Sequence, residues 1–180
     1  MRSPGRLATI SLLICSSFVL ASLERLIPNP FPMIRFGLGN IMTLAAFALF
    51  GIEAGIWVTG GRVVLVALIW GGMLSPTAVL SIAGGAASLL AMIAVMSIRG
   101  RFSLFGVSVA GAYAHVAAQI AVASVLYVRS LDLFRILPVL GGIGLLTGIL
   151  NGAVAQILVE KMEGRLDQHG GSREPGVRIR

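Results

Sequence analysis

The stretch LFGVSVAGAYAHVAAQIAVASVLYV, residues 104–128, decides the fold class. It contains no Asp, Glu, Lys or Arg, and its only strongly polar side chains are those of His115 and Gln119. A helix needs about 20 mostly apolar residues to cross the hydrocarbon core of a bilayer. This stretch is long and apolar enough, so it predicts a transmembrane helix.

Five other stretches have the same character and a roughly adequate length. They are residues 7–23, 34–50, 56–73, 78–98 and 136–159. The whole chain is 57% hydrophobic and 12% charged, which is too apolar for one soluble domain of 180 residues. We therefore predict an all-α, polytopic membrane protein with a bundle of six transmembrane helices. The first stretch could also be read as a cleaved signal peptide, but we expect a retained helix because five more spans follow.

The net charge of +7 does not indicate nucleic-acid binding, because the basic residues are scattered and have no aromatic platform beside them. Their distribution between the two sides of the membrane is better explained by topology. With the N-terminus inside, nine basic residues lie on the inner side: Arg2, Arg6, Arg99, Arg101, Lys161, Arg165, Arg173, Arg178 and Arg180. The outer side has four: Arg25, Arg35, Arg129 and Arg135. This asymmetry predicts that both termini are cytoplasmic. After a transmembrane domain at 1–160, residues 161–180 are polar and basic, and we expect a disordered cytoplasmic tail.

Small residues recur at helical spacing and predict close packing between helices. Gly144, Gly148 and Gly152 form two successive GxxxG steps in the last span. Comparable positions are Gly84 and Gly85 in the fourth span and Gly111 in the fifth. Lipid provides no hydrophobic drive for helix pairing, so small residues that let backbones approach closely stabilise the bundle.

His115 and Gln119 are one helical turn apart, on a face that also carries Gly111. Asn40 and Thr43 are expected at a similar depth in the second span. Because polar groups at that depth are costly unless they are satisfied, these four residues could form a substrate-binding site. It would lie beneath the outer loop at 24–32, which contains three prolines. The alternative is an interhelical hydrogen-bond network without a ligand.

Two charged residues have expected roles at the membrane surfaces. Arg62 is the one charge well inside a predicted span, and its long side chain could reach the inner headgroups. A salt bridge or a functional cation is the second interpretation for Arg62. Glu24 is expected at the outer interface, where ordinary solvation explains it, although it could contribute to a cap over the site.

Signatures of catalysis are absent from the sequence. Its seven acidic residues include no paired aspartates that would hold magnesium against a diphosphate. There is no glycine-rich phosphate loop with a lysine, and two histidines with one cysteine make a zinc site improbable. We therefore expect no enzyme activity, no metal and no cofactor.

Several short motifs together resemble one family. They are GluArgLeuIlePro at 24–28, GlyLeuGlyAsnIle at 37–41, SerPro at 75–76, AlaGlyGly at 83–85, and GlyValSerValAlaGlyAla at 106–112 followed by His115 and Gln119. In this order, over about residues 7–160, they resemble heptaprenyl diphosphate synthase component I, also called the Gx transporter family. The chain departs from the pattern of many relatives at His115-Val116, where they have His-Asn, and at Gly39, where they have Ala.

The resemblance implies two different functions. The family name implies a non-catalytic membrane subunit of a prenyl synthase in menaquinone side-chain biosynthesis. Such a subunit would bind its soluble partner through Arg99–Arg101 and the tail from Lys161.

The size and hydropathy also resemble the S-components of energy-coupling factor importers. These are six-helix proteins of the bacterial inner membrane that work with a coupling transmembrane subunit and ATPases. This resemblance implies a substrate-binding or transport protein for a small vitamin-like or isoprenoid-related solute.

Overall fold

The computed structural model describes residues 4–26, 36–70, 75–98 and 103–168, and these residues contain helices and no strand. The helices are α1 (Pro4–Leu26), α2 (Gly39–Phe50), α3 (Ile52–Trp70), α4 (Pro76–Ser97), α5 (Leu104–Ala123), the π-helix η1 (Ser124–Val128), the 3-10 helix η2 (Leu131–Ile136) and α6 (Leu137–Gln168). All α-helices except α2 belong to segments that are long and apolar enough to cross a membrane. The predicted all-α, multi-pass membrane fold is confirmed.

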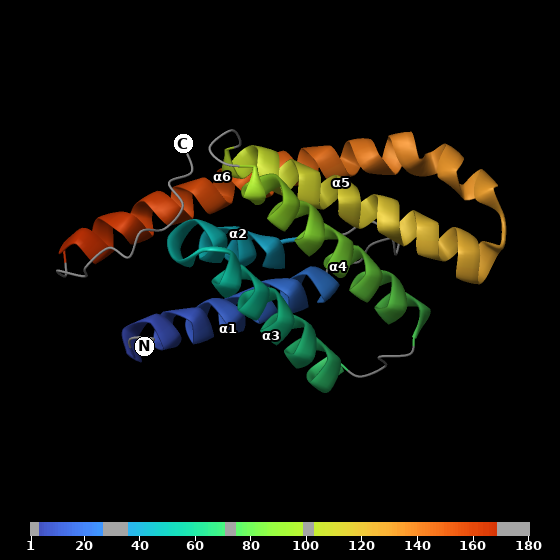
Figure 1. The fold of residues 1–180 in the computed structure, drawn as a ribbon. Coiled ribbons are helices and arrows are strands. Elements are labelled where there is room, and N and C mark those ends of the chain that lie inside the picture. Colours follow the sequence, from blue (N-terminus) through green and yellow to red (C-terminus); the bar gives the residue numbers. More distant parts are fainter. Residues whose placement is uncertain (1–3, 27–35, 71–74, 99–102, 169–180) are drawn as a thin grey trace.

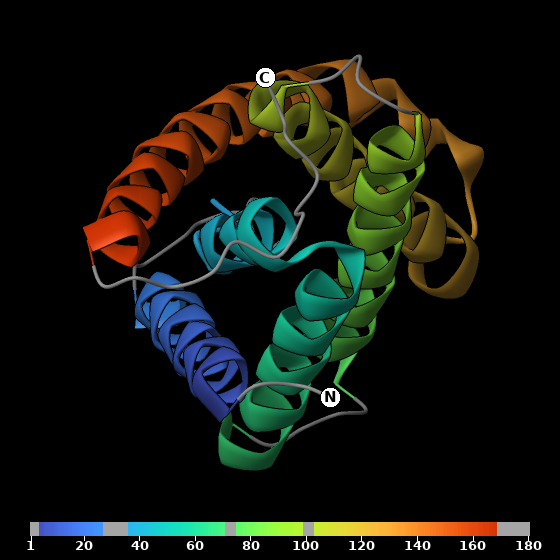
Figure 2. The same cartoon turned by 60° about the vertical axis from the view of Figure 1, so that its left-hand side comes forward.

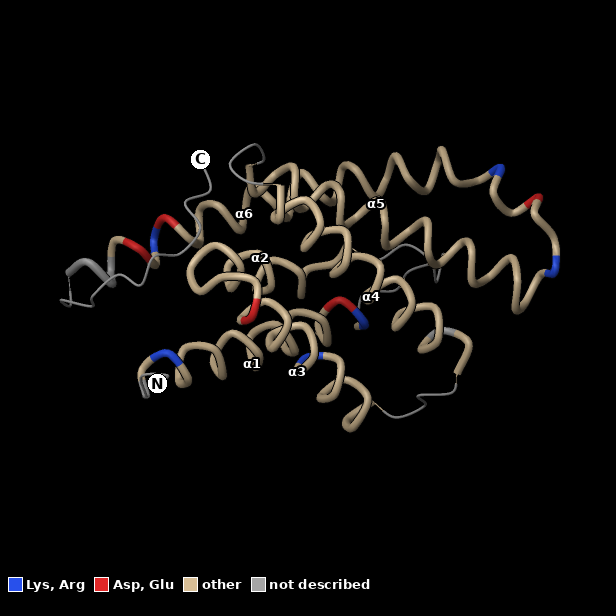
Figure 3. The backbone as a smooth tube through the Cα atoms, viewed as in Figure 1, with Lys and Arg blue, Asp and Glu red and all other residues tan. Residues whose placement is uncertain are grey.

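The short helix α2 lies in the middle of the bundle, and the other helices surround it (Figure 2). The described start of α1 and the described end of α6 lie at the same end of the molecule (Figure 1). This arrangement agrees with the predicted topology, in which both ends of the chain lie on one side of the membrane. Charged residues gather mostly toward the ends of the helices (Figure 3), which leaves apolar lengths between them for the bilayer.

Two helix starts are set by local side-chain chemistry. Ser75 precedes α4 and its hydroxyl oxygen accepts a hydrogen bond from the Ala78 amide at 3.2 Å, with Pro76 in the first turn. Ser103 caps α5 in the same way through the Gly106 amide at 3.4 Å. Such caps satisfy amides that a helix leaves unpaired at its start. The predicted spans 78–98 and 104–128 agree closely with these boundaries.

Two other predicted boundaries were wrong. Within the span expected at 34–50, the helix begins only at Gly39, so α2 has 12 residues and a length of about 18 Å. Gly37 precedes it with φ of 70°, a left-handed conformation that hydropathy does not reveal. At the other end of the chain, α6 continues to Gln168, so residues 161–168 are helical and not part of a disordered tail. Residues 169–180 lie outside the described part.

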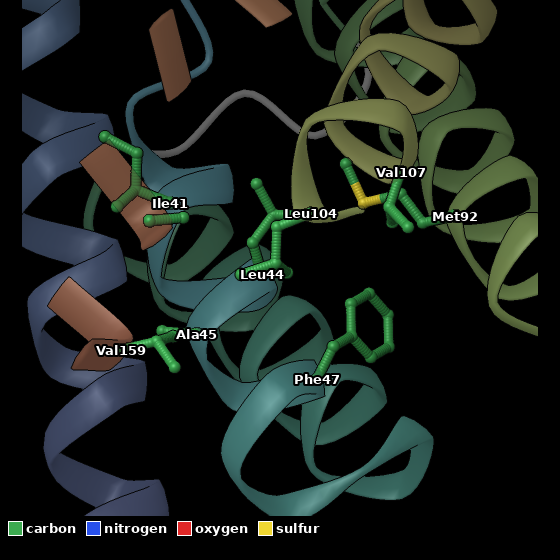
Figure 4. Close-up of a cluster of buried hydrophobic side chains, with 9 residues drawn as sticks. Ile41, Leu44, Ala45, Phe47, Met92, Leu104, Val107 and Val159 are labelled. Carbon is green, nitrogen blue, oxygen red and sulfur yellow. The ribbon is translucent and has the colours of Figure 1, made fainter. Parts of the chain in front are cut away.

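The core is built around α2 (Figure 4). Its buried residues pack against side chains from three other helices: Ile41, Leu44, Ala45 and Phe47 of α2, Met92 of α4, Leu104 and Val107 of α5, and Ala155 and Val159 of α6. The outward faces carry exposed apolar side chains such as Leu68, Leu90 and Val139, as expected where helices meet lipid. Because α2 lies at the centre of the bundle, its start lies among the other helices. The candidate site is at this start.

Candidate functional site

The start of α2 lies inside the bundle and not at its outer surface. The Ser17 hydroxyl of α1 donates a hydrogen bond to the Gly39 carbonyl at 2.8 Å, and Ser17 is fully buried. Ser17 lies nine residues before the end of α1 at Leu26, which is about 14 Å along the helix. The first amides of α2 therefore need partners from protein side chains, because the bilayer supplies none.

Glu24 of α1 provides acceptors for the two backbone amides that directly precede α2. Its Oε1 accepts a hydrogen bond from the Gly37 amide at 2.9 Å, and its Oε2 accepts one from the Leu38 amide at 3.1 Å. A carboxylate at a helix start also interacts favourably with the positive end of the helix dipole. Glu24 was expected to be a solvated interfacial residue, and its contact with two backbone amides shows a structural role instead.

Arg62 of α3 contacts the same region. Its Nη1 donates a hydrogen bond to the Asn40 Oδ1 at 3.0 Å. The guanidinium also lies directly over Gly39, where an added Cβ would be only 2.5 Å from Nη1. The expectation that Arg62 reaches the inner headgroups was wrong, because Asn40 lies at the opposite end of α2 from the turn at Gly51. The Asn40 side chain, within the bundle, binds the Arg62 guanidinium in place of the lipid headgroups.

Asn151 of α6 completes the arrangement. Its amide nitrogen Nδ2 donates to the Phe36 carbonyl at 2.6 Å and to the Gly37 carbonyl at 3.3 Å, and the residue is buried. Asn151 is not among the site residues predicted from the sequence. Its signal in the sequence was a polar amide side chain within an apolar span, which is costly unless it is satisfied.

We call the residues that meet here the α2-start cluster: Ser17, Glu24, Asn40, Arg62 and Asn151. They come from α1, α2, α3 and α6 and surround the backbone at 36–40. The cluster combines a cation, a carboxylate and two amides, which can bind a polar or charged solute. Among the described residues, no three His, Cys, Asp or Glu side chains come together as a metal site.

The four residues predicted from the sequence fall into two groups. Asn40 belongs to the α2-start cluster, and Thr43 lies one turn deeper, where its hydroxyl is 3.0 Å from the Thr59 hydroxyl of α3. His115 and Gln119 lie at the contact between α5 and α4. A Cβ at Gly84 would be 2.8 Å from the His115 Nε2 and 3.0 Å from the Gln119 Cγ.

The glycines of α6 lie against α5. A Cβ at Gly148 would be 3.0 Å from the Val109 Cα, and one at Gly152 would be 3.0 Å from the Phe105 Cα. Gly144 faces the Val116 side chain at 3.1 Å. The two backbones approach closely along this face, so side chains larger than hydrogen would force α5 and α6 apart.

Two further glycines between α4 and α5 differ from each other. Gly111 of α5 lies against the Met92 and Ser88 side chains, with its Cβ position 3.0 Å from the Ser88 Oγ. Gly85 has no heavy atom of the described residues within 4 Å of its Cβ position. Close packing between these helices therefore involves Gly84 and Gly111 and not Gly85.

The sequence model of the family described as heptaprenyl diphosphate synthase component I matches residues 13–158. The chain belongs to this family. The matched region contains the whole α2-start cluster, together with His115 and Gln119. No curated protein matches the sequence.

A solved structure shares the fold of this component I family member. It is described as the S component of a bacterial ECF transporter, and it matches with a TM-score of 0.53 and 23% sequence identity. The match covers 95% of this chain and 100% of the other chain. The component I family member therefore has the helical architecture seen in a transporter S component.

Proposed function

We propose that this component I family member is the substrate-binding membrane component of a transporter, in the manner of an S-component. It binds a small vitamin-like or isoprenoid-related solute from the outer side of the bacterial inner membrane. The observation that carries the proposal is the recessed start of α2, where Arg62, Asn40 and Asn151 meet inside the bundle.

Helices that begin within the membrane are costly, since their first amides must be satisfied without water. Transporters use such short helices to bind solutes near the middle of the bilayer. An ionised side chain such as Arg62 in the bundle interior is likewise more typical of a functional site than of simple packing. The shared fold with an S component supports the same function.

In this proposal, the solute enters from the outer side, and helix rocking or reorientation of the bundle then releases it inward. Of the outer loop expected at 24–32 as a cap over the site, residues 24–26 belong to α1 and residues 27–32 lie outside the described residues. The chain has no phosphate-binding loop, so we propose that a coupling transmembrane subunit and ATPases supply the energy.

A second candidate function is the one in the family name: a membrane subunit for a soluble prenyl synthase. One structural observation favours it, which is the length of α6. Its 32 residues extend over about 48 Å, longer than a hydrocarbon core of about 30 Å. Its last turns could bind a cytoplasmic partner, together with Arg99 and Arg101, which lie outside the described residues.

Affinity purification of the tagged chain at native abundance, in mild detergent, separates these two functions. Recovery of a coupling subunit and ATPases supports the transporter. Recovery of a soluble prenyl synthase supports the second candidate. A variant truncated after Val159 is the matched control: it should retain a transmembrane coupling subunit but lose a partner that binds the end of α6.

His115 was predicted from the sequence as a binding residue, and if it contacts the solute, replacing it by alanine should weaken solute binding about tenfold. The protein should remain folded, because the removed ring lies at a helix contact and not in the main core. Binding is measured on purified protein in nanodiscs. Gln156→Ala, in the C-terminal half of α6, is the control and should leave the affinity for the solute unchanged. Equal affinities of His115→Ala and wild type would remove His115 from the site.

A further inference from the structure

Two polar side chains between α4 and α5 are almost completely buried. Gln119 is 1% exposed and Ser88 is 2% exposed. Within the described part of the chain, neither the Gln119 Oε1 nor the Ser88 Oγ has a hydrogen-bond partner. A buried polar atom without a partner lowers stability, and native proteins usually satisfy such atoms with protein, water or ligand.

Several other buried polar side chains of the bundle are satisfied. Thr43 and Thr59 bond to each other, Ser17 bonds to the Gly39 carbonyl, and Asn151 bonds to two carbonyls. Among the described residues, the buried Ser124 Oγ of η1 also has no hydrogen-bond partner, whereas the Gln119 and Ser88 atoms both belong to the contact between α4 and α5. Gln119 and Ser88 also lie near each other. Gln119 of α5 faces Gly84 of α4, and Ser88 follows Gly84 by one turn of α4.

We propose that the Gln119 amide oxygen and the Ser88 hydroxyl recognise hydrogen-bond donors of the bound solute. This inference rests on the proposed function and deepens it by naming the chemical class. The recognised group carries N–H or O–H donors, which a hydrocarbon tail does not offer. Neither α4 nor α5 contains an Asp, Glu, Lys or Arg residue that would pair with a charge on this group.

The first test needs no solute. Gln119→Leu keeps the approximate size of the side chain and removes the unsatisfied amide, so the solute-free protein in nanodiscs should melt about 3 °C higher than wild type. Thr43→Val is the matched control, since it removes a buried hydroxyl that does have a partner, and it should lower the melting temperature. A lower melting temperature for Gln119→Leu would show a structural hydrogen bond and overturn the inference.

The second test uses fractions of a polar-metabolite extract from the host cells, added to the same nanodiscs. A fraction that raises the melting temperature of wild type and of Gln156→Leu, but not of Gln119→Leu or Ser88→Ala, supports the inference. If the fraction stabilises all four proteins equally, Gln119 and Ser88 do not contact the solute and water fills their place. That result overturns the inference but keeps the proposed function. If no fraction stabilises wild type, the proposed function fails and the inference fails with it.

Discussion

Replacing Glu24 by alanine should lower the free energy of unfolding by about 3 kcal/mol, since it removes two charge-assisted hydrogen bonds to backbone amides. The Gly37 and Leu38 amides would both lose their acceptor. Tryptophan fluorescence during SDS titration in mixed micelles measures the change.

Two variants make this result specific. Glu24→Gln retains one carbonyl acceptor and should lose about half as much free energy of unfolding as the alanine variant. Glu160→Ala removes an exposed carboxylate whose partner is the Gln156 side chain, so its effect should be close to zero. Equal stabilities of Glu24→Ala and Glu160→Ala would contradict a role for Glu24 in holding the start of α2.

Replacing Gly148 by leucine should destabilise the bundle by about 3 kcal/mol, because the new side chain would meet backbone atoms of α5 and not flexible side-chain ends. The Val109 Cα lies 3.0 Å from the position that the new Cβ would occupy. Helices α5 and α6 would have to separate along the whole face that Gly144 and Gly152 also occupy. The same SDS titration measures this change.

Gly142→Leu is the control for this experiment. Gly142 belongs to the same helix, and no heavy atom of the described residues lies within 4 Å of its Cβ position. Both substitutions remove a helical glycine, so the difference between them isolates the contact with α5. If Gly142→Leu were as destabilising as Gly148→Leu, loss of close packing could not be the cause.

Hydropathy and spacing were sufficient to predict much of this fold. Lipid imposes a length and an apolar composition on each span, so the boundaries of α4 and α5 could be read from the sequence. The periodicity of Gly144, Gly148 and Gly152 also pointed to one helix face, although it did not identify α5 as the neighbour. Periodicity shows that one face of a helix carries small residues, but it does not show which helix packs against that face.

The α2-start cluster could not be predicted in the same way. Its hydrogen bonds join Glu24 to residue 37, Arg62 to Asn40, and Asn151 to residue 36, which are far apart in the sequence. Each residue taken alone fits a simpler interpretation, such as solvation for Glu24 or a contact with headgroups for Arg62. Only the late start of α2 creates the unpaired amides that bring these side chains together.

Native mass spectrometry of the chain, after incubation with a polar-metabolite extract and removal of free metabolites, tests the central claim most directly. The account predicts one bound small molecule per wild-type chain and none, or far less, for Arg62→Met. The exposed-site variant Arg135→Met should bind as wild type does. A wild-type chain without any bound molecule, or equal occupancy in Arg62→Met, would contradict solute binding at the start of α2.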